Sequence, residues 1–265
     1  MHIVLANLTN GGLSGGSRKY LEVLAPMLAR HPVVSRLDLF VPPQAVESLH
    51  KCTRLEWNSW LHNDVSHGFR GLRREILKRR PDVVFIPSAR WIDCGSAPVV
   101  GMVRNMEPLA VPFAGNPWLE TLRTIARRWV AKRACRKADR IIAVSNFVRD
   151  YLVDTWKLPT EKIATVYHGI ELPSGNDDAY PPQGLMDHNH KFLFTAGSVR
   201  PYRGLEDAVG AMPYILKRHS DMSLVIGGET EPAMQPYRNR LQRQAEELGC
   251  AHRIHWVGKL TQAEM

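Results

Sequence analysis

Short apolar runs alternate along the chain with longer segments in which apolar residues recur every three to four positions. The short runs are typical of buried strands, and the longer segments are typical of amphipathic helices that cover a sheet. Predicted strands lie at residues 2–6, 37–41, 83–86, 99–102, 140–144, 163–167, 191–196, 223–227 and 253–257. Predicted helices lie at residues 17–29, 69–79, 118–137, 146–155, 204–217 and 235–248. Because parallel strands need a long crossover, this alternation predicts an α/β fold with doubly wound parallel sheets.

One segment interrupts the alternation. Residues 171–190 contain three prolines and two glycines among many polar residues, without a periodic apolar pattern. That composition predicts a linker at 173–190, which separates a first domain (1–172) from a second (191–265). The second domain has three predicted strands and two helices. Since three parallel strands form a small sheet with edges to cover, we expect this domain to be incomplete.

The composition is that of an ordinary globular protein, with 265 residues of which 44% are hydrophobic. No run of 18 apolar residues exists, which argues against a transmembrane helix, and the first residues do not resemble a secretory signal. Four cysteines (Cys52, Cys94, Cys135 and Cys250) are far apart and form no CxxC pair. We therefore expect a cytoplasmic, reducing location with neither a zinc site nor disulfides.

The net charge of +9 is concentrated in two stretches, 70–80 and 123–140. Both have helical character, and Leu122, Ile125 and Trp129 mark an apolar side of the second. A solvated helix face explains such charge most simply. Alternatively, the basic helix 123–137 contacts an anionic membrane peripherally, at its inner face. Nucleic acid is a weaker alternative and is not expected as a partner, because no binding motif accompanies the charge.

The strand at 191–196 runs into Gly197, Ser198, Arg200 and Arg203 before a helix begins. A strand that opens onto a helix start leaves backbone N–H groups available, and the arginines add positive charge. This corner is therefore suited to an anion such as a phosphate. The alternative is a plain strand-turn-helix whose arginines face solvent.

A second glycine-rich corner, NGGLSGGS at residues 10–17, includes Gly15 and Gly16. Its glycines allow close backbone approach to a ligand, and the following helix favours a phosphate. The spacing is not GxGxxG, and Asp38 lies within the second strand rather than after it, so an NAD site is not favoured. A flexible turn is the alternative.

Three further positions carry candidate chemistry. Ser145 follows a strand and is well placed as the N-cap of the next helix. His168 could contact a ligand across an interdomain cleft, or could be structural. The polar segment RNMEP, with Asn105 and Glu107, follows the strand 99–102 and could bind an acceptor hydroxyl. Alternatively, Arg104 and Glu107 pair with each other.

Several segments in order resemble a GT-B glycosyltransferase of the family 4 type. They are GGLSGG, ADRIIAV with SNFVRDYL, KIATVYHGIE, GSVRPYRG and IHWVGKL. The resemblance spans nearly the whole chain. It implies two Rossmann-like domains that bind a nucleotide-sugar in the cleft between them and transfer the sugar with retention of configuration. It also implies that no metal or other cofactor is needed.

The resemblance assigns roles to glycines in both corners. Gly15 and Gly16 match the family's glycine-rich loop near the donor phosphates, and Gly197 and Ser198 match the phosphate corner of the second domain. Ser198 takes a position that is often arginine in the family.

Two other positions, Arg203 and Asn105, depart from the family's pattern. Arg203 stands where the family usually has lysine and keeps the positive charge, and Arg200 could compensate for Ser198. Asn105 lies near a position where many relatives carry a histidine, which puts a simple acid–base role for Asn105 and Glu107 in doubt.

The family continues beyond a segment such as IHWVGKLTQAEM into further strands and a pair of glutamates that this sequence does not contain. We therefore expect a retaining hexosyltransferase-like enzyme of polysaccharide biosynthesis, or a portion of one. Its partners would be a nucleotide-diphosphate sugar and a glycan or lipid-linked acceptor. The alternatives are a non-catalytic nucleotide-sugar or glycan-binding protein and a GT-B-like sugar-nucleotide epimerase.

Overall fold

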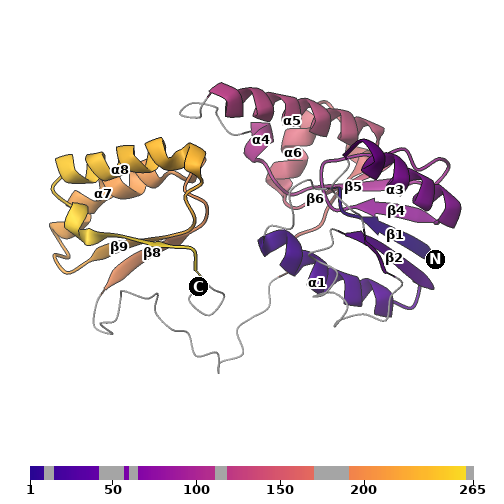
Figure 1. Ribbon diagram of the computed structural model, residues 1–265, viewed down its shortest axis with the longest axis horizontal. Coiled ribbons are helices and arrows are strands. Elements are labelled where there is room, and N and C mark those ends of the chain that lie inside the picture. The colour runs from indigo at the N-terminus through magenta and orange to yellow at the C-terminus, as the bar shows by residue number, and fades with distance from the viewer. Residues whose placement is uncertain (9–14, 42–56, 60–64, 111–117, 170–190, 261–265) are drawn as a thin grey trace. The chain divides into compact units, whose positions relative to one another are not determined.

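The computed structural model describes residues 1–8, 15–41, 57–59, 65–110, 118–169 and 191–260. Contacts within the chain divide it into two compact units, Met1–Leu109 with Thr124–Gly169, and Ala110–Arg123 with Ile170–Met265. The predicted linker at 173–190 lies outside the described residues. Each unit contains one parallel sheet (Figure 1).

The first sheet has seven described strands in the order β3-β2-β1-β4-β5-β6-β7, and the paired strands are parallel. The strand order reverses between β1 and β4, as in doubly wound folds, whose ligands bind at the carboxyl ends of the strands beside that reversal. The strands are β1 (His2–Ala6), β2 (Arg36–Val41), β3 (Trp57–Ser59), β4 (Val83–Ile86), β5 (Val99–Val103), β6 (Arg140–Ala143) and β7 (Ile163–Thr165).

Helices cover both faces of the first sheet (Figure 1). On one face, α1 (Gly15–Arg30) packs Leu21 and Ala25 against β1 and β2. On the other face lie α3 (Val65–Arg79), α5 (Trp118–Lys137) and α6 (Asn146–Asp154), which share a second core. A short helix α4 (Glu107–Ala110) follows β5, and a 3₁₀ turn (Thr160–Lys162) precedes β7.

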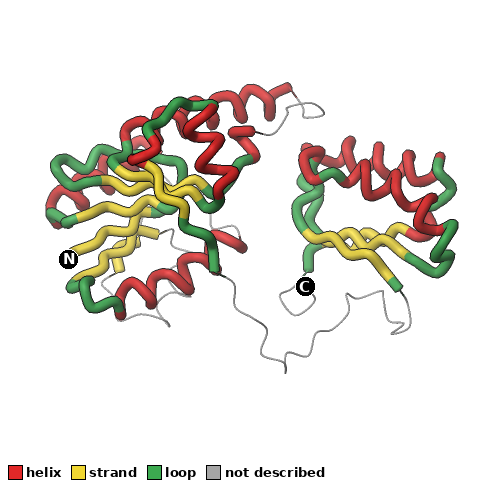
Figure 2. The backbone as a smooth tube through the Cα atoms, turned by 180° about the vertical axis from the view of Figure 1, so that it is seen from behind, coloured by secondary structure: helices red, strands yellow, loops and turns green. Residues whose placement is uncertain are grey.

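The second sheet has three described strands in the order β10-β9-β8, and its pairs are parallel. Two helices pack on one of its faces (Figure 2). The elements are β8 (Phe192–Ala196), α7 (Leu205–Leu216), β9 (Ser223–Gly227), α8 (Gln235–Glu247) and β10 (Ile254–Gly258), with 3₁₀ turns at Pro201–Arg203, Pro232–Met234 and Ala251–Arg253. Among the described residues, Phe192, Leu193 and Phe194 of β8 stay about two-fifths exposed.

The predicted fold class is confirmed, and the predicted elements coincide with the observed ones to within a few residues. Sequence analysis missed two elements, β3 and α4. Both are too short to show a period, since β3 has three residues and α4 has four. Ser145 is the N-cap of α6, as expected, because its side chain accepts a hydrogen bond from Val148 N at 3.2 Å.

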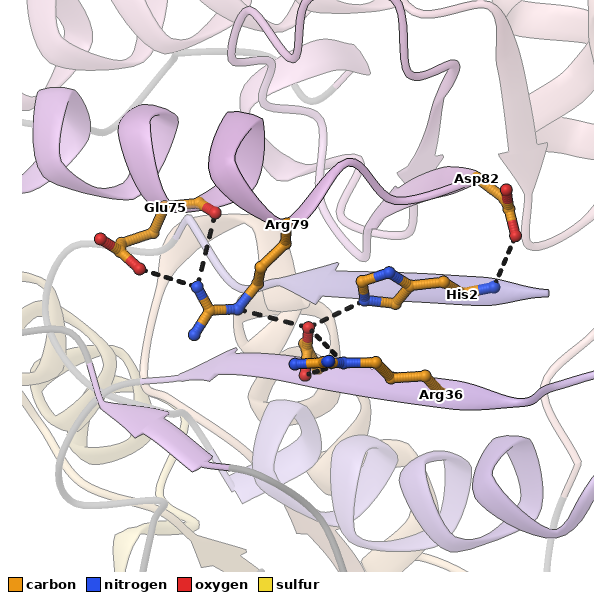
Figure 3. Close-up of polar contacts among 6 residues, drawn as sticks. His2, Arg36, Glu75, Arg79 and Asp82 are labelled. Atoms are coloured by element: carbon orange, nitrogen blue, oxygen red, sulfur yellow. Dashed lines mark hydrogen bonds and ion pairs between the residues drawn. The ribbon is translucent and has the colours of Figure 1, made fainter.

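Asp38 of β2 is only 1% exposed, and three basic side chains surround its carboxylate. His2 Nε2 lies 2.8 Å from Oδ2, Arg36 Nε donates to Oδ1 at 3.1 Å, and Arg79 Nε lies 3.3 Å from Oδ2. Figure 3 shows His2 from β1, Arg36 from β2 and Arg79 from the end of α3 converging on this point. The cluster links two strands to a helix and explains why a carboxylate occurs inside a strand.

Replacing Asp38 with Asn keeps the shape but removes the charge that these basic groups share. We expect the free energy of unfolding to fall by about 2 kcal/mol, because hydrogen bonds to charged groups contribute ~1.5–3 kcal/mol each and the amide keeps one acceptor. Urea denaturation followed by circular dichroism measures the change. The surface pair Arg73–Asp93 is the matched control, and Asp93→Asn should have a clearly smaller effect. Equal losses for both variants would contradict the role given to the cluster.

Candidate functional site

The first candidate corner lies at the carboxyl edge of the seven-stranded sheet. Gly15, Gly16 and Ser17 form the first turn of α1, which begins after β1 beside the point where the strand order reverses. The first N–H groups of a helix have no partner inside it, and the helix dipole favours negative charge there. The loop that precedes this turn, residues 9–14, lies outside the described residues.

Arg104, which follows β5, reaches the start of α1. Its guanidinium donates a hydrogen bond to Ser17 Oγ at 2.5 Å and lies 5.5 Å from the centre of the Tyr20 ring. Tyr20 in turn contacts His168, after β7, edge to face at 5.1 Å. Helix α1 after β1, the segment after β5 and the segment after β7 therefore meet in one place. Their side chains form a polar cluster, which consists of Ser17, Tyr20, Arg104 and His168.

Burial sets the electrostatics of this cluster. It lowers the pKa of Arg104 and raises that of Tyr20, whose shift the neighbouring Arg104 charge partly opposes. An arginine still remains protonated at neutral pH, so the cluster holds a half-buried positive charge beside a neutral phenol. Such a charge is screened less than one in open solvent, and it favours an anionic group at this edge.

Asn105 and Glu107 lie at the start of α4, directly after Arg104. Asn105 Oδ1 accepts a hydrogen bond from Glu107 N at 3.0 Å, so the asparagine closes the turn that starts this helix. Arg104 contacts Ser17 and Tyr20, which differs from the alternative of a pair with Glu107. The structure thus places both predicted catalytic candidates beside the cluster and gives Asn105 a capping contact.

The second candidate corner lies where β8 ends. Gly197 has a φ of 148°, a value that side chains strongly disfavour, and its N–H donates to Gly227 O at 2.9 Å. The guanidinium of Arg203 lies against the bare face of this glycine, because a Cβ added there would be 2.9 Å from Arg203 Cζ. Residues from β8, the segment after β8, the start of α7 and β9 surround a small hollow. It is lined by Thr195, Ala196, Gly197, Ser198, Arg203, Leu205, Ile226 and Gly227.

The two arginines of this corner differ in their surroundings. Arg200 Nη2 lies 2.7 Å from each carboxylate oxygen of Glu231, which balances its charge. Arg203 is exposed and lies on the hollow, close to the N-terminus of α7. Gly204, with a φ of 67°, is the N-cap of α7. Of the two, Arg203 is therefore the better placed to meet an anion.

Sequence analysis missed part of this corner. Gly228 and Gly258 end β9 and β10 as Gly197 ends β8, with φ values of 138° and 70°. Gly228 N donates to Gly258 O at 2.5 Å. The carboxyl edge of the second sheet is thus formed by three glycines, each with a positive φ that disfavours a side chain. The signal was a glycine at the end of each strand, in TAG, IGG and WVG.

Two α/β units, each built on one parallel sheet, are the architecture of the GT-B class of proteins. Residues 14–173, more than half of the sequence, match the family described as "Glycosyltransferase Family 4", and residues 176–265 match "Glycosyl transferases group 1". The chain therefore belongs to glycosyltransferase family 4, with a group 1 segment in its second unit.

Solved structures with low sequence identity share this fold. HepE of Anabaena in complex with UDP and glucose superimposes with a TM-score of 0.67 at 16% identity, covering 98% of this chain and 70% of that one. WaaG, a glycosyltransferase involved in lipopolysaccharide biosynthesis, gives 0.60 at 14% identity, covering 99% and 71%. An uncharacterised glycosyltransferase of Methanocaldococcus jannaschii is 25% identical over 127 residues, which is 45% of this chain and 31% of that relative.

Proposed function

We propose that the protein transfers a sugar from a nucleoside-diphosphate sugar to a hydroxyl group of a glycan or lipid-linked acceptor. The transfer retains the anomeric configuration and uses no metal ion. The observation that carries the proposal is the position of the Arg203 guanidinium against Gly197, at the carboxyl end of β8. A cation, a glycine without a side chain and a helix start around one small hollow are features that favour the binding of a diphosphate.

In this proposal Arg203 stabilises the leaving group. When the bond between the anomeric carbon and the diphosphate breaks, negative charge develops on the diphosphate oxygens. Arg203 donates to those oxygens, and so do the first N–H groups of α7. Groups that meet charge as it develops usually make the largest contribution to catalysis. Gly197 and Ser198 let the diphosphate approach the backbone, and Arg200, paired with Glu231, positions the turn.

The first unit has a glycine turn of its own and carries the residues that are proposed for the acceptor. The turn at Gly15 and Gly16 offers N–H groups, and Arg104 holds this turn through Ser17. Asn105 and Glu107 follow directly and are proposed to contact the acceptor hydroxyl. Structural neighbours support the choice of donor, because HepE was solved with UDP and with UDP-glucose.

The test combines binding with turnover. Calorimetry should show that UDP or GDP binds at least about tenfold more tightly than the matching nucleoside, because the diphosphate supplies charge-assisted hydrogen bonds of ~1.5–3 kcal/mol each. Incubation with UDP-sugars and candidate acceptors should release UDP at the same rate with and without EDTA. NMR of the product should show the anomeric configuration of the donor.

Other outcomes would assign another function. Nucleotide binding without turnover would favour a non-catalytic binding protein. Isomerised sugar formed without an acceptor would favour an epimerase, a reaction class also found among proteins of this fold, such as a putative UDP-N-acetylglucosamine 2-epimerase from Listeria monocytogenes with a TM-score of 0.53. Equal affinity for nucleoside and nucleoside diphosphate would overturn the proposed role of Gly197 and Arg203 in binding the diphosphate.

A further inference from the structure

Helix α5 has two apolar faces. Its inward face consists of small side chains, and Ala131, Ala134 and Cys135 are buried in the first unit. A second set of apolar residues, Trp118, Leu122, Ile125 and Trp129, recurs at spacings of four, three and four. That spacing places them in a row along one side of a helix, opposite the inward face. This row is called the outer stripe.

The outer stripe is open to solvent. Trp118 is 71% exposed, Leu122 56%, Ile125 47% and Trp129 64%. Single exposed apolar residues are normal, but a contiguous row of large ones on a helix marks a surface that binds something. Two tryptophans are suited to an interface that is apolar on one side and wet on the other.

The charge of α5 indicates the nature of that partner. The helix carries seven lysines and arginines and one acidic residue, Glu120. Arg133 lies over the Trp129 ring at 5.7 Å, and Lys132 and Arg136 continue the line of the outer stripe towards the end of the helix. An apolar row bordered by cations is complementary to a surface that is anionic outside and apolar beneath.

The other basic helix of the chain provides a contrast. Helix α3 is also rich in arginine and lysine, but its apolar residues Leu72 and Ile76 are buried in the core. Its outward side is therefore polar, as expected of a solvated helix. Charge alone does not distinguish the two helices, whereas the outer stripe does.

We propose that α5 lies flat on an anionic lipid bilayer, with the outer stripe at the boundary between headgroups and acyl chains. None of the described helices is long and apolar enough to cross a membrane, so the contact is peripheral. A second copy of the chain is a poorer partner, because a symmetric contact through this face would bring the same cations together. The proposal goes beyond sugar transfer and does not depend on it.

The test is flotation with vesicles of phosphatidylcholine, with and without phosphatidylglycerol. The parent protein should float with the anionic vesicles and much less with neutral ones, and added salt should weaken the binding. The double variant Leu122→Ser/Trp129→Ser should bind at least about tenfold more weakly, because it removes two large apolar anchors. Lys132→Gln/Arg133→Gln should lose roughly fivefold per charge removed.

The matched control removes two exposed cations from α3, as Arg74→Gln/Lys78→Gln. If charge and apolar contact act together at α5, this control should keep most of the binding. Circular dichroism checks that each variant is folded, which is expected because every replaced side chain is at least partly exposed. Parent protein that stays at the bottom of the gradient would overturn the proposal. So would an equal loss in the α3 control, or a dimer in solution that dissociates in the Leu122→Ser/Trp129→Ser variant.

Discussion

Arg203→Ala should lower the rate of sugar transfer by about 100- to 1000-fold, the usual loss when one donor to a developing charge is removed. The guanidinium lies against Gly197 in the hollow where β8 ends, and no side chain can replace glycine there without displacing it. Steady-state kinetics with saturating nucleotide-sugar measures the effect on kcat. Calorimetry with UDP measures how much the variant loses in binding before the reaction, and we expect the affinity for UDP to fall by about 10- to 100-fold.

Two further variants make this prediction specific. Arg203→Lys keeps the charge but loses the planar fork, so we expect it to retain activity within about tenfold of the parent. Arg218→Ala removes an exposed arginine just beyond the opposite end of α7 and should leave both rate and affinity unchanged. Because Arg203 is exposed, its removal should not change the melting temperature. Equal kcat and UDP affinity for parent and Arg203→Ala would exclude the assigned role.

The fold was predictable because its signals are local. Apolar runs such as 83–86 and the amphipathic helices between them carry their own period, so the alternation of parallel strands and helices follows from the sequence. The missed strand β3 is held by its pairing with β2 rather than by any pattern of its own. Its existence depends on neighbours that are distant in the sequence.

The candidate site was predictable only in part, for the same reason. Gly197 and Arg203 are close in sequence, and their juxtaposition follows from a strand, a turn and a helix in succession. The contact between Ser17 and Arg104 joins residues 87 positions apart, and it exists because the reversal of strand order brings the ends of distant strands together. The salt bridge between Arg200 and Glu231 likewise joins segments after two different strands. Sequence alone assigned both arginines the same role.

The outer stripe on α5 was visible in the sequence as a pattern, but its exposure could not be predicted from that pattern. The sequence contains its apolar residues, but a row of tryptophan, leucine and isoleucine on a helix usually marks the side that packs on the core. The structure shows that the smaller residues Ala131, Ala134 and Cys135 face the core instead. Helix orientation is decided by how closely the helix approaches the sheet, and small residues permit the closer approach.

Gly228→Ala should unfold the carboxyl edge of the second sheet. A Cβ at this position would lie 1.7 Å from Gly197 O, and the φ of 138° is itself nearly restricted to glycine. The backbone cannot easily move apart at either glycine, because Gly197 N donates a hydrogen bond to Gly227 O and Gly228 N donates one to Gly258 O. We therefore expect a loss of about 3–5 kcal/mol in the free energy of unfolding of the second unit.

The measurement is thermal unfolding monitored by circular dichroism, together with UDP binding well below the transition. For a unit of this size, a loss of about 3 kcal/mol lowers the melting temperature by roughly 12–24 °C. The same chemical change at Gly210, inside α7, is the control, because a Cβ there is 3.6 Å from Gln244 Nε2, an ordinary contact. Gly210→Ala should stabilise the protein by about 0.5–1 kcal/mol, since alanine favours the helix. If Gly228→Ala melted with the parent and bound UDP as tightly, the close approach of Gly197 and Gly228 would not be what shapes this edge, and the diphosphate would have to be held elsewhere.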